Sequence, residues 1–319
     1  MSVPSRAGHA SPRAVRRRVL LAVGAGTGFA LTGALAAGLR GALAAAPQPV
    51  GADDRPALRG RAPALFVGHG SPMNAVQDNR FTRTLKRWGY EIGLPRAIVV
   101  VSAHWLTPRS TRVSGASAPE TIHDFGGFPA ELQTMTYPAP GAPALAARTA
   151  ARLGPRASAI DAERGLDHGA WTVLHRLYPV ADVPVFQLSI DIAQAAPYHL
   201  AVGRALAALR DEGVLVIGSG NIVHNLSATE RGAGETAHGL TAWAEDFDQQ
   251  VKRALDAGDH GALVAYDRLT SGVPMAVPSP DHYFPLLYAL GAARPDEAPR
   301  HVFEGFQAGT LSMRCLQWG

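Results

Sequence analysis

Cysteine is almost absent from this sequence, and its absence limits the kinds of metal centre that the protein can hold. The chain of 319 residues contains one cysteine, Cys315. A single thiol cannot form an internal disulfide, a four-cysteine zinc site or an iron–sulfur cluster. A metal centre in this protein must therefore use histidine or carboxylate ligands.

Sequence repeats and several catalytic motifs are absent as well. No unit of about 20 to 50 residues recurs, which argues against a solenoid or a propeller. The sequence lacks HExxH, GxxxxGK[ST] and GxSxG, so a zincin peptidase, a P-loop nucleotide enzyme and a serine hydrolase lose their usual support. Gly218-Ser219-Gly220 resembles the start of a dinucleotide fingerprint, but Val223 occupies the third glycine position.

Acidic residues and lysine are missing from the first 46 residues. This leader contains six arginines, whereas the rest of the chain holds 24 basic and 26 acidic residues. The formal net charge of +4 therefore comes from the leader, and the remainder has no basic excess that would indicate a nucleic-acid partner. Hydrophobic residues make up 47% of the chain, which is typical of a globular protein.

The leader has the three parts of a secretory export signal. Arg16-Arg17-Arg18 precedes the uncharged stretch 19–39, and small residues up to Ala46 provide a cleavage site. The arginines are similar to a twin-arginine signal, which implies the twin-arginine export machinery as a partner. The alternative is an uncleaved membrane anchor, because 21 uncharged residues can span a bilayer. Five glycines in the stretch favour cleavage, so we expect a periplasmic or exported protein.

After the export signal over 1–46, a polar linker over 47–62 precedes one catalytic domain over 63–319. Nearly continuous β-branched runs alternate there with stretches that have apolar residues at helical spacing. This order predicts an α/β fold, a single domain whose central, largely parallel or mixed sheet is flanked by helices. The expected strands are 64–67, 97–101, 183–190 and 214–217. The expected helices are 142–153, 170–177, 197–210, 240–255 and 283–290, with a loop over 271–280.

Three of the twelve histidines follow predicted strands. His69, His104 and His224 come after the first, second and fourth strands. Ligands in an open α/β sheet bind at the carboxyl ends of the strands, so these side chains can converge. A lone histidine at a strand end is more often a capping or hydrogen-bonded residue, and the prediction rests on the shared placement. Three imidazoles with open positions describe a catalytic metal centre, and imidazole suits iron, zinc, copper and nickel.

Other histidines stand in loops that border predicted helices. His168 follows Asp167 just before one helix, and either residue is a candidate N-cap. His282 precedes another helix, where capping is again the alternative to metal ligation. His123 and Phe125 lie on a loop rich in aromatic residues and glycine, which predicts a lid or a wall of the substrate site.

Eight motifs over residues 63–319 together resemble one enzyme family, the class III extradiol ring-cleavage dioxygenases. The similarity is to its LigB-like branch, the 4,5-DOPA extradiol dioxygenase family. The motifs, in chain order, are GHGSPMNA (68–75), VVVSAHW (99–105), TIHDFGGFP (121–129), YPAPGAP (137–143), LDHGAW (166–171), QLSID (187–191), GSGNIVHNL (218–226) and DHYFPLLYALGA (281–292).

The resemblance implies a metal-dependent dioxygenase that cleaves a catechol-type, DOPA-like aromatic with O2 to a muconic semialdehyde. His69 and His104 match the first two metal ligands. His282 stands at the late position where a carboxylate is usual elsewhere in the class, so the single divalent metal could be Fe(II) or Zn(II). His224 matches the catalytic base and is also counted as a fourth ligand. His168 matches an active-site histidine that contacts substrate or oxygen.

The resemblance also assigns supporting roles. His123 and Phe125 would bind the substrate ring, while Asp167 and Asn225 would fix the tautomers of the ligand imidazoles through hydrogen bonds. Two alternatives remain open at this point. One is a zinc-dependent enzyme of hydrolase type on the same scaffold, and the other is a metal-binding protein without catalytic activity.

Overall fold

The computed structural model describes residues 55–230 and 233–319. The predicted export signal and the linker up to residue 54 lie outside the described residues. The described end of that linker contacts the catalytic domain, since the Leu58 N–H donates to the Leu94 carbonyl and Ala62 is buried. Within the described ranges, none of the helices combines the length and the hydrophobicity that crossing a membrane requires.

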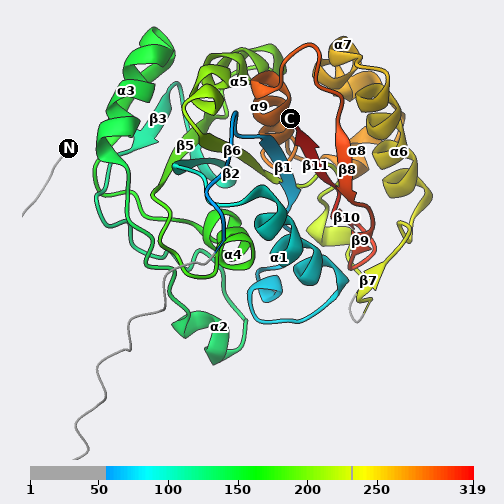
Figure 1. Cartoon of the computed structure of the whole chain (residues 1–319). Coiled ribbons are helices and arrows are strands. Elements are labelled where there is room, and N and C mark those ends of the chain that lie inside the picture. Colours follow the sequence, from blue (N-terminus) through cyan, green and yellow to red (C-terminus); the bar gives the residue numbers. More distant parts are fainter. Residues whose placement is uncertain (1–54, 231–232) are drawn as a thin grey trace, which may run out of the picture. The chain divides into compact units, whose positions relative to one another are not determined.

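A mixed sheet of eight strands forms the centre of the domain (Figure 1). Its strands are β1 (Ala64–Gly68), β2 (Ala97–Thr107), β3 (Thr111–Ser114), β4 (Ala157–Asp161), β5 (Val185–Asp191), β6 (Val214–Gly220), β8 (Arg300–Phe303) and β11 (Cys315–Trp318). They lie in the order β4-β3-β5-β2-β6-β1-β11-β8. The four middle strands, β5, β2, β6 and β1, pair in parallel, and β11 and β8 extend one edge in antiparallel pairing. This architecture confirms the predicted fold class.

The middle strands are hydrophobic at nearly every position because helices cover both faces of the sheet. All residues of β1 and β6 are buried. Successive side chains of β1 point to opposite faces, so Phe66 belongs to one core and Leu65 and Val67 to the other. The first core contains residues of α5 (Ala196–Asp211), α6 (Ala242–Asp256) and α9 (Phe284–Ala292), and the second contains residues of α1 (Arg80–Ile92) and α4 (His168–Leu177).

The five predicted helices are present, and their ends agree with the prediction within two residues. They are α3 (Pro143–Leu153), α4, α5, α6 and α9. The other α-helices of the described residues are α1, which the sequence did not predict, and the short helices α2 (Ala130–Thr134), α7 (His260–Val264) and α8 (Val273–Ala276). The prediction of a loop over 271–280 was therefore wrong in part, because it contains α8. A separate sheet joins β7 (Glu235–Thr236), β9 (Phe306–Gln307) and β10 (Leu311–Ser312).

Strand β2 is six residues longer than the sequence predicts. The apolar run ends at Val101, but after a register shift the backbone pairs with β5 again at Leu106 and Thr107. His104 thus lies inside the extended strand and not after it. His69 directly follows β1, and His224 lies four residues after the end of β6. Because β1, β6 and β2 are parallel neighbours, His69, His224 and His104 all lie toward the carboxyl ends of these strands.

Two glycines of β6 allow another part of the chain to approach the strand closely. A Cβ atom at Gly218 would lie 2.1 Å from the Pro285 carbonyl oxygen, and one at Gly220 would lie 2.2 Å from the His282 carbonyl oxygen. A side chain at either position would displace the segment that carries His282. These glycines make room for that backbone segment, which brings His282 to the edge of the sheet.

Candidate active site

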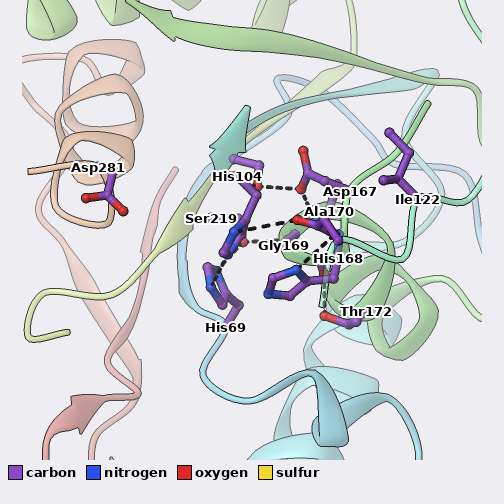
Figure 2. A network of polar contacts seen from close by, with 12 residues as sticks. His69, His104, Ile122, Asp167, His168, Gly169, Ala170, Thr172, Ser219 and Asp281 are labelled. Atoms are coloured by element: carbon purple, nitrogen blue, oxygen red, sulfur yellow. Dashed lines mark hydrogen bonds and ion pairs between the residues drawn. The ribbon is translucent and has the colours of Figure 1, made fainter. Parts of the chain in front are cut away.

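Four imidazoles from separate stretches of the chain meet at the carboxyl edge of the sheet. The ring centroids of His69 and His104 are 5.0 Å apart, those of His104 and His168 are 3.8 Å apart, and that of His282 lies 5.3 Å from His69 and 5.0 Å from His104. Figure 2 shows the side chains of His69, His104 and His168 close together, beside Ser219. His69, His168 and His282 are buried, and His104 is partly buried.

The cluster has the dimensions of a metal site. Two nitrogen ligands at 2.0–2.1 Å from a tetrahedral ion lie about 3.3 Å apart, and the Nε2 atoms of His69 and His104 are separated by 3.2 Å. Ligand atoms of His69, His104 and His168 all lie within 4.8 Å of one another. Nε2 of His282 is buried and has no hydrogen-bond partner among the described residues, as expected for an atom that serves as a ligand. The cluster could therefore bind a metal ion.

The tautomer of His69 follows from its neighbours. The Ser219 hydroxyl donates its hydrogen to the Gly169 carbonyl at 2.6 Å, so its oxygen accepts from Nδ1–H of His69 at 3.0 Å. In the neutral ring Nε2 then carries a lone pair. Ser219 belongs to β6, and Gly169 to the first turn of α4. One hydroxyl therefore ties the strand, the helix and the imidazole together.

Carboxylates face Nδ1 of the other three imidazoles. Asp124 Oδ1 lies 3.0 Å from His168 Nδ1, at an angle that makes an ion-pair contact and not a hydrogen bond. Its Oδ2 lies 3.7 Å from His104 Nδ1, and Asp281 Oδ2 lies 2.6 Å from His282 Nδ1. Such partners orient imidazole ligands and fix their tautomers. The hydrogen bonds at Nδ1 of His69 and His282 therefore leave Nε2 available to an ion, while Asp124 faces Nδ1 of His104 and His168.

The electrostatics keep His69, His104 and His224 neutral and two carboxylates charged. Burial, followed by the neighbouring histidines, lowers the pKa of His69 and His104 well below the usual 6.5 and that of His224 to about 3. Burial alone would raise the pKa of Asp124, but its contacts with His168 lower it to about 2. The pKa of Asp281 is lowered in the same way by His282. Neutral imidazole is the form that binds a metal.

His224 lies at the side of the cluster. Its ring stacks on that of His282 with centroids 3.4 Å apart and planes 4° from parallel. The structure therefore brings together all of the histidines predicted as ligands, with His224 in contact with the group through His282. His168, predicted to contact substrate or oxygen, lies closer to His104 than the other rings do. The division of these five residues into ligands and catalytic groups stays a prediction.

Asp167 is fully buried, and it is linked to the backbone of His104 through the hydroxyl of Ser102. Its carboxylate accepts hydrogen bonds from Ser102, Gln187 and Arg164 at 2.6–2.8 Å. Ser102 Oγ in turn accepts the N–H of His104 at 3.2 Å. Asp167 is also the N-cap of α4, accepting from the Ala170 N–H. The capping alternative is thus realised by Asp167, while His168 is the first residue of the helix.

Asn225 caps a short 3-10 turn. Its side-chain oxygen accepts from the N–H groups of Ser227 and Ala228, and its amide group donates to the Met275 carbonyl. The side-chain oxygen also accepts from the Ser227 hydroxyl, and within the described part of the chain none of the hydrogen bonds of the Asn225 side chain goes to an imidazole. Its predicted role in fixing a tautomer therefore gains no support from these contacts.

The loop over 121–129 forms an aromatic wall beside the cluster. The ring of Phe125 lies edge-on to His168 with centroids 5.6 Å apart, and it contacts Trp171 and Phe128. His123 lies 5.7 Å from Trp171, and its Nε2 is 2.9 Å from the Met135 carbonyl oxygen. Both predicted substrate-binding residues thus lie on the loop whose Phe125 packs against His168.

Three residues that contact the imidazoles were not identified from the sequence: Ser219, Asp124 and Asp281. A weak signal exists for the two aspartates, because each is adjacent to a histidine in the chain. Asp124, however, contacts histidines far along the chain and not its neighbour His123. Only the packing of the loop on α4 decides where this carboxylate lies.

Comparison with known proteins identifies the family. Residues 63–313 match the family model of the catalytic LigB subunit of aromatic ring-opening dioxygenase. The chain belongs to this LigB family. A 4,5-DOPA dioxygenase extradiol from Escherichia coli K12 is 46% identical over 263 residues, which cover 81% of this chain and 95% of that protein. A Beta vulgaris protein of the same name is 38% identical over 254 residues, covering 78% of this chain and 93% of the relative.

A solved structure agrees with these sequence matches. The crystal structure of an uncharacterized protein from Escherichia coli K12 has a TM-score of 0.70 to this chain at 42% identity, covering 81% of this chain and 100% of that one. The LigB protein described here is an oxidoreductase, an extradiol ring-cleavage dioxygenase. The hydrolase-type alternative is not favoured by these relatives.

Proposed function

We propose that this LigB protein is a metal-dependent dioxygenase that cleaves a DOPA-like catechol with O2 to a muconic semialdehyde. The observation that carries the proposal is the convergence of four imidazoles, each with Nδ1 turned to a hydroxyl or carboxylate and Nε2 left for an ion. The names of the Escherichia coli and Beta vulgaris relatives support a DOPA-like substrate.

The residues that would hold the metal are His69, His104 and His282, with His224 or His168 as a further ligand. The donor set consists of neutral nitrogens, which suit both Fe(II) and Zn(II). Bound there, the metal would bring the diol and O2 together and carry the electron transfer between them. The protein side chains fix where both substrates lie and which protons move.

His224 is the proposed proton acceptor for a catechol hydroxyl. With its pKa lowered to about 3, the ring is neutral at physiological pH and is therefore in the accepting form. The parallel contact with His282 holds the ring in one orientation. The ring of His168 contacts both His104 and Phe125, which supports its proposed role in contacting the substrate or oxygen.

The aromatic wall would bind the substrate ring. Phe125 presents its face or edge to a planar ligand beside the cluster, and aromatic pairs of this kind contribute about 0.5–1.5 kcal/mol beyond area burial. His123 is held by the Met135 carbonyl and would contact the ring substituent.

The test combines metal analysis, oxygen uptake and a small panel of catechols. Purified protein reconstituted with Fe(II) or Zn(II) is mixed with DOPA, catechol and related diols in an oxygen electrode, with a spectrophotometer following the yellow semialdehyde. The expected result is one mole of O2 consumed for each mole of semialdehyde formed. Tightly held zinc with no oxygen uptake on any diol would contradict the proposal. Resorcinol, whose hydroxyls are not adjacent, is the matched control and should remain uncleaved.

Export is proposed from the leader alone. Arg16-Arg17-Arg18 and the uncharged stretch after them support transport by the twin-arginine machinery and cleavage near Ala46. Cell fractionation should find the enzyme in the exported fraction, and N-terminal sequencing should begin close to residue 47. Replacing the three arginines by lysine should retain the protein inside the cell, whereas Arg6→Lys should not. Export of the triple-lysine variant at the parental level would contradict the proposal.

A further inference from the structure

The carboxylate of Asp124 reaches two imidazoles of the cluster from the aromatic loop. One oxygen lies 3.7 Å from Nδ1 of His104, and the other lies 3.0 Å from Nδ1 of His168. The side chain is 26% exposed, so the protein shields most of its charge. The nearby Asp167 does not take this place, because its oxygens accept from Ser102, Gln187 and Arg164.

Asp124 also binds the backbone at the start of α4. Its Oδ1 accepts the N–H of His168 at 2.9 Å. This N–H belongs to the first residue of the helix and has no partner inside the helix. A carboxylate at this end is further stabilised by the helix dipole. One oxygen of Asp124 therefore contacts both the backbone and the ring of His168, and it fixes the position of each.

The loop residues just before and just after Asp124 also bind the first turn of α4 and the residues that lead into it. Before Asp124, the Ile122 N–H donates to the Leu166 carbonyl and the Ile122 carbonyl accepts from Trp171 Nε1. After Asp124, Phe125 packs on His168 and Trp171. The carboxylate and the aromatic wall are consecutive residues, so neither can shift without displacing the other.

We infer that Asp124 is a positioning residue that couples the aromatic wall to the metal-binding cluster. It holds Nδ1 of His104 and His168 toward an acceptor, so that their Nε2 atoms face the ion. By the same contacts it fixes the position of the next residue, Phe125, which lies beside His168 and would contact the substrate. The inference rests on the proposed function, because it assigns these imidazoles to a metal centre.

The alternative to coupling is a purely local role, in which Asp124 only caps α4. The two roles differ in what they require of the side chain. A cap needs an acceptor oxygen, which asparagine also supplies. Orientation of two Nδ1–H groups beside a cation needs the negative charge, which asparagine lacks. Asp124→Asn therefore separates the two roles, and it should leave the fold intact.

The experiment measures metal affinity and spectrum before activity. Full-length Asp124→Asn, Asp124→Glu and the parent protein are loaded with Co(II), and the dissociation constant is obtained by chelator competition. Loss of an outer partner of a metal ligand typically weakens metal affinity about 10- to 100-fold. We expect a loss of that size and a changed visible Co(II) spectrum in Asp124→Asn, with partial recovery in Asp124→Glu. The melting temperature of the metal-free protein should stay near that of the parent.

Glu120→Gln is the matched control, since Glu120 is an exposed carboxylate just before the same loop. Co(II) affinity and spectrum of Asp124→Asn that match those of Glu120→Gln would overturn the inference and leave only the capping role. With the parent active on a catechol, Asp124→Asn should also raise KM, because the loop that carries Phe125 loses its charged contact with His104 and His168. If the parent cleaves no catechol, the proposed function fails, while the Co(II) measurements still decide the role of Asp124.

Discussion

The histidine cluster is bordered on one side by strand residues and on the other by a loop, here called the sheet flank and the loop flank. The sheet flank consists of His69, Ser219 and Gly218, which lie on or directly after β1 and β6 and are all buried. The loop flank consists of residues 121–129, where Asp124 keeps a quarter of its side chain exposed. On the sheet flank, the hydroxyl of Ser219 in β6 accepts a hydrogen bond from His69. On the loop flank, the carboxylate of Asp124 and the ring of Phe125 contact the neighbouring imidazoles.

This difference separates a part of the site built on strands from a part built on a loop. Side chains fixed by regular elements are placed more accurately than those on loops, and metal ligation requires such accuracy. Loops tolerate change and carry the contacts that distinguish one ligand from another. We therefore expect substitutions on the sheet flank to affect both metal binding and stability, and those on the loop flank to affect substrate binding and, at Asp124, also metal affinity.

The largest expected effect is loss of the metal from the sheet flank. His69→Ala removes a predicted ligand and should reduce metal affinity by more than about 100-fold, since removal of an outer partner alone costs about 10- to 100-fold. Metal content after gel filtration and oxygen uptake both measure this loss. His238→Ala is the control, because that histidine has an 82% exposed side chain and should leave both readouts unchanged. Full metal content in His69→Ala would refute the ligand role.

A second prediction sets one glycine of each flank against the other. In Gly218→Ala the new Cβ would meet the Pro285 carbonyl oxygen at 2.1 Å, so overpacking should destabilise the protein by about 1–3 kcal/mol or more. In Gly126→Ala the new Cβ meets nothing within 4 Å, so the change should stay within about 0.5 kcal/mol. Urea unfolding of the two variants measures the contrast. Equal urea midpoints for the two variants would contradict the predicted difference in stability between the flanks.

The third prediction concerns the hydroxyl that holds His69. Ser219→Ala leaves a buried Nδ1–H without an acceptor, which should destabilise the protein by about 1–3 kcal/mol. Metal affinity should fall about 10- to 100-fold, because the ring loses its orientation. Asp124→Asn is the comparison, since we expect it to weaken metal binding without lowering stability. Chemical denaturation and chelator competition on both variants distinguish a structural partner from one that acts by charge alone.

The smallest effect is expected for the aromatic wall. Phe125→Ala removes ring contacts worth about 0.5–1.5 kcal/mol, which corresponds to a rise in KM of roughly 2- to 12-fold for a catechol substrate. The metal content should not change. Steady-state kinetics with oxygen uptake give KM and kcat separately, and Phe125→Tyr should keep most of the parental KM. A lower metal content with unchanged KM would contradict the prediction, because Phe125 would then contribute to metal binding and not to substrate binding.

The sequence predicted five of the helices and the parallel centre of the sheet, because apolar residues at regular spacing mark buried elements whatever they pack against. It did not predict α1, a helix of 13 residues. It misjudged β2, where polar residues such as Ser102 and His104 interrupt the apolar run while backbone pairing with β5 continues. The antiparallel strand β11 was not predicted, because it pairs with β1 across almost the whole described chain.

The sequence by itself determined which residue types are present for the chemistry, one thiol and twelve histidines, and that the first strand ends directly before His69. Tertiary structure decided which acceptor meets which imidazole. Ser219 reaches His69 because β6 pairs with β1, and Asp124 reaches His104 and His168 because its loop packs on α4. A hydrogen bond or ion pair depends on a few tenths of an ångström between distant segments, and no local pattern in the chain encodes that distance.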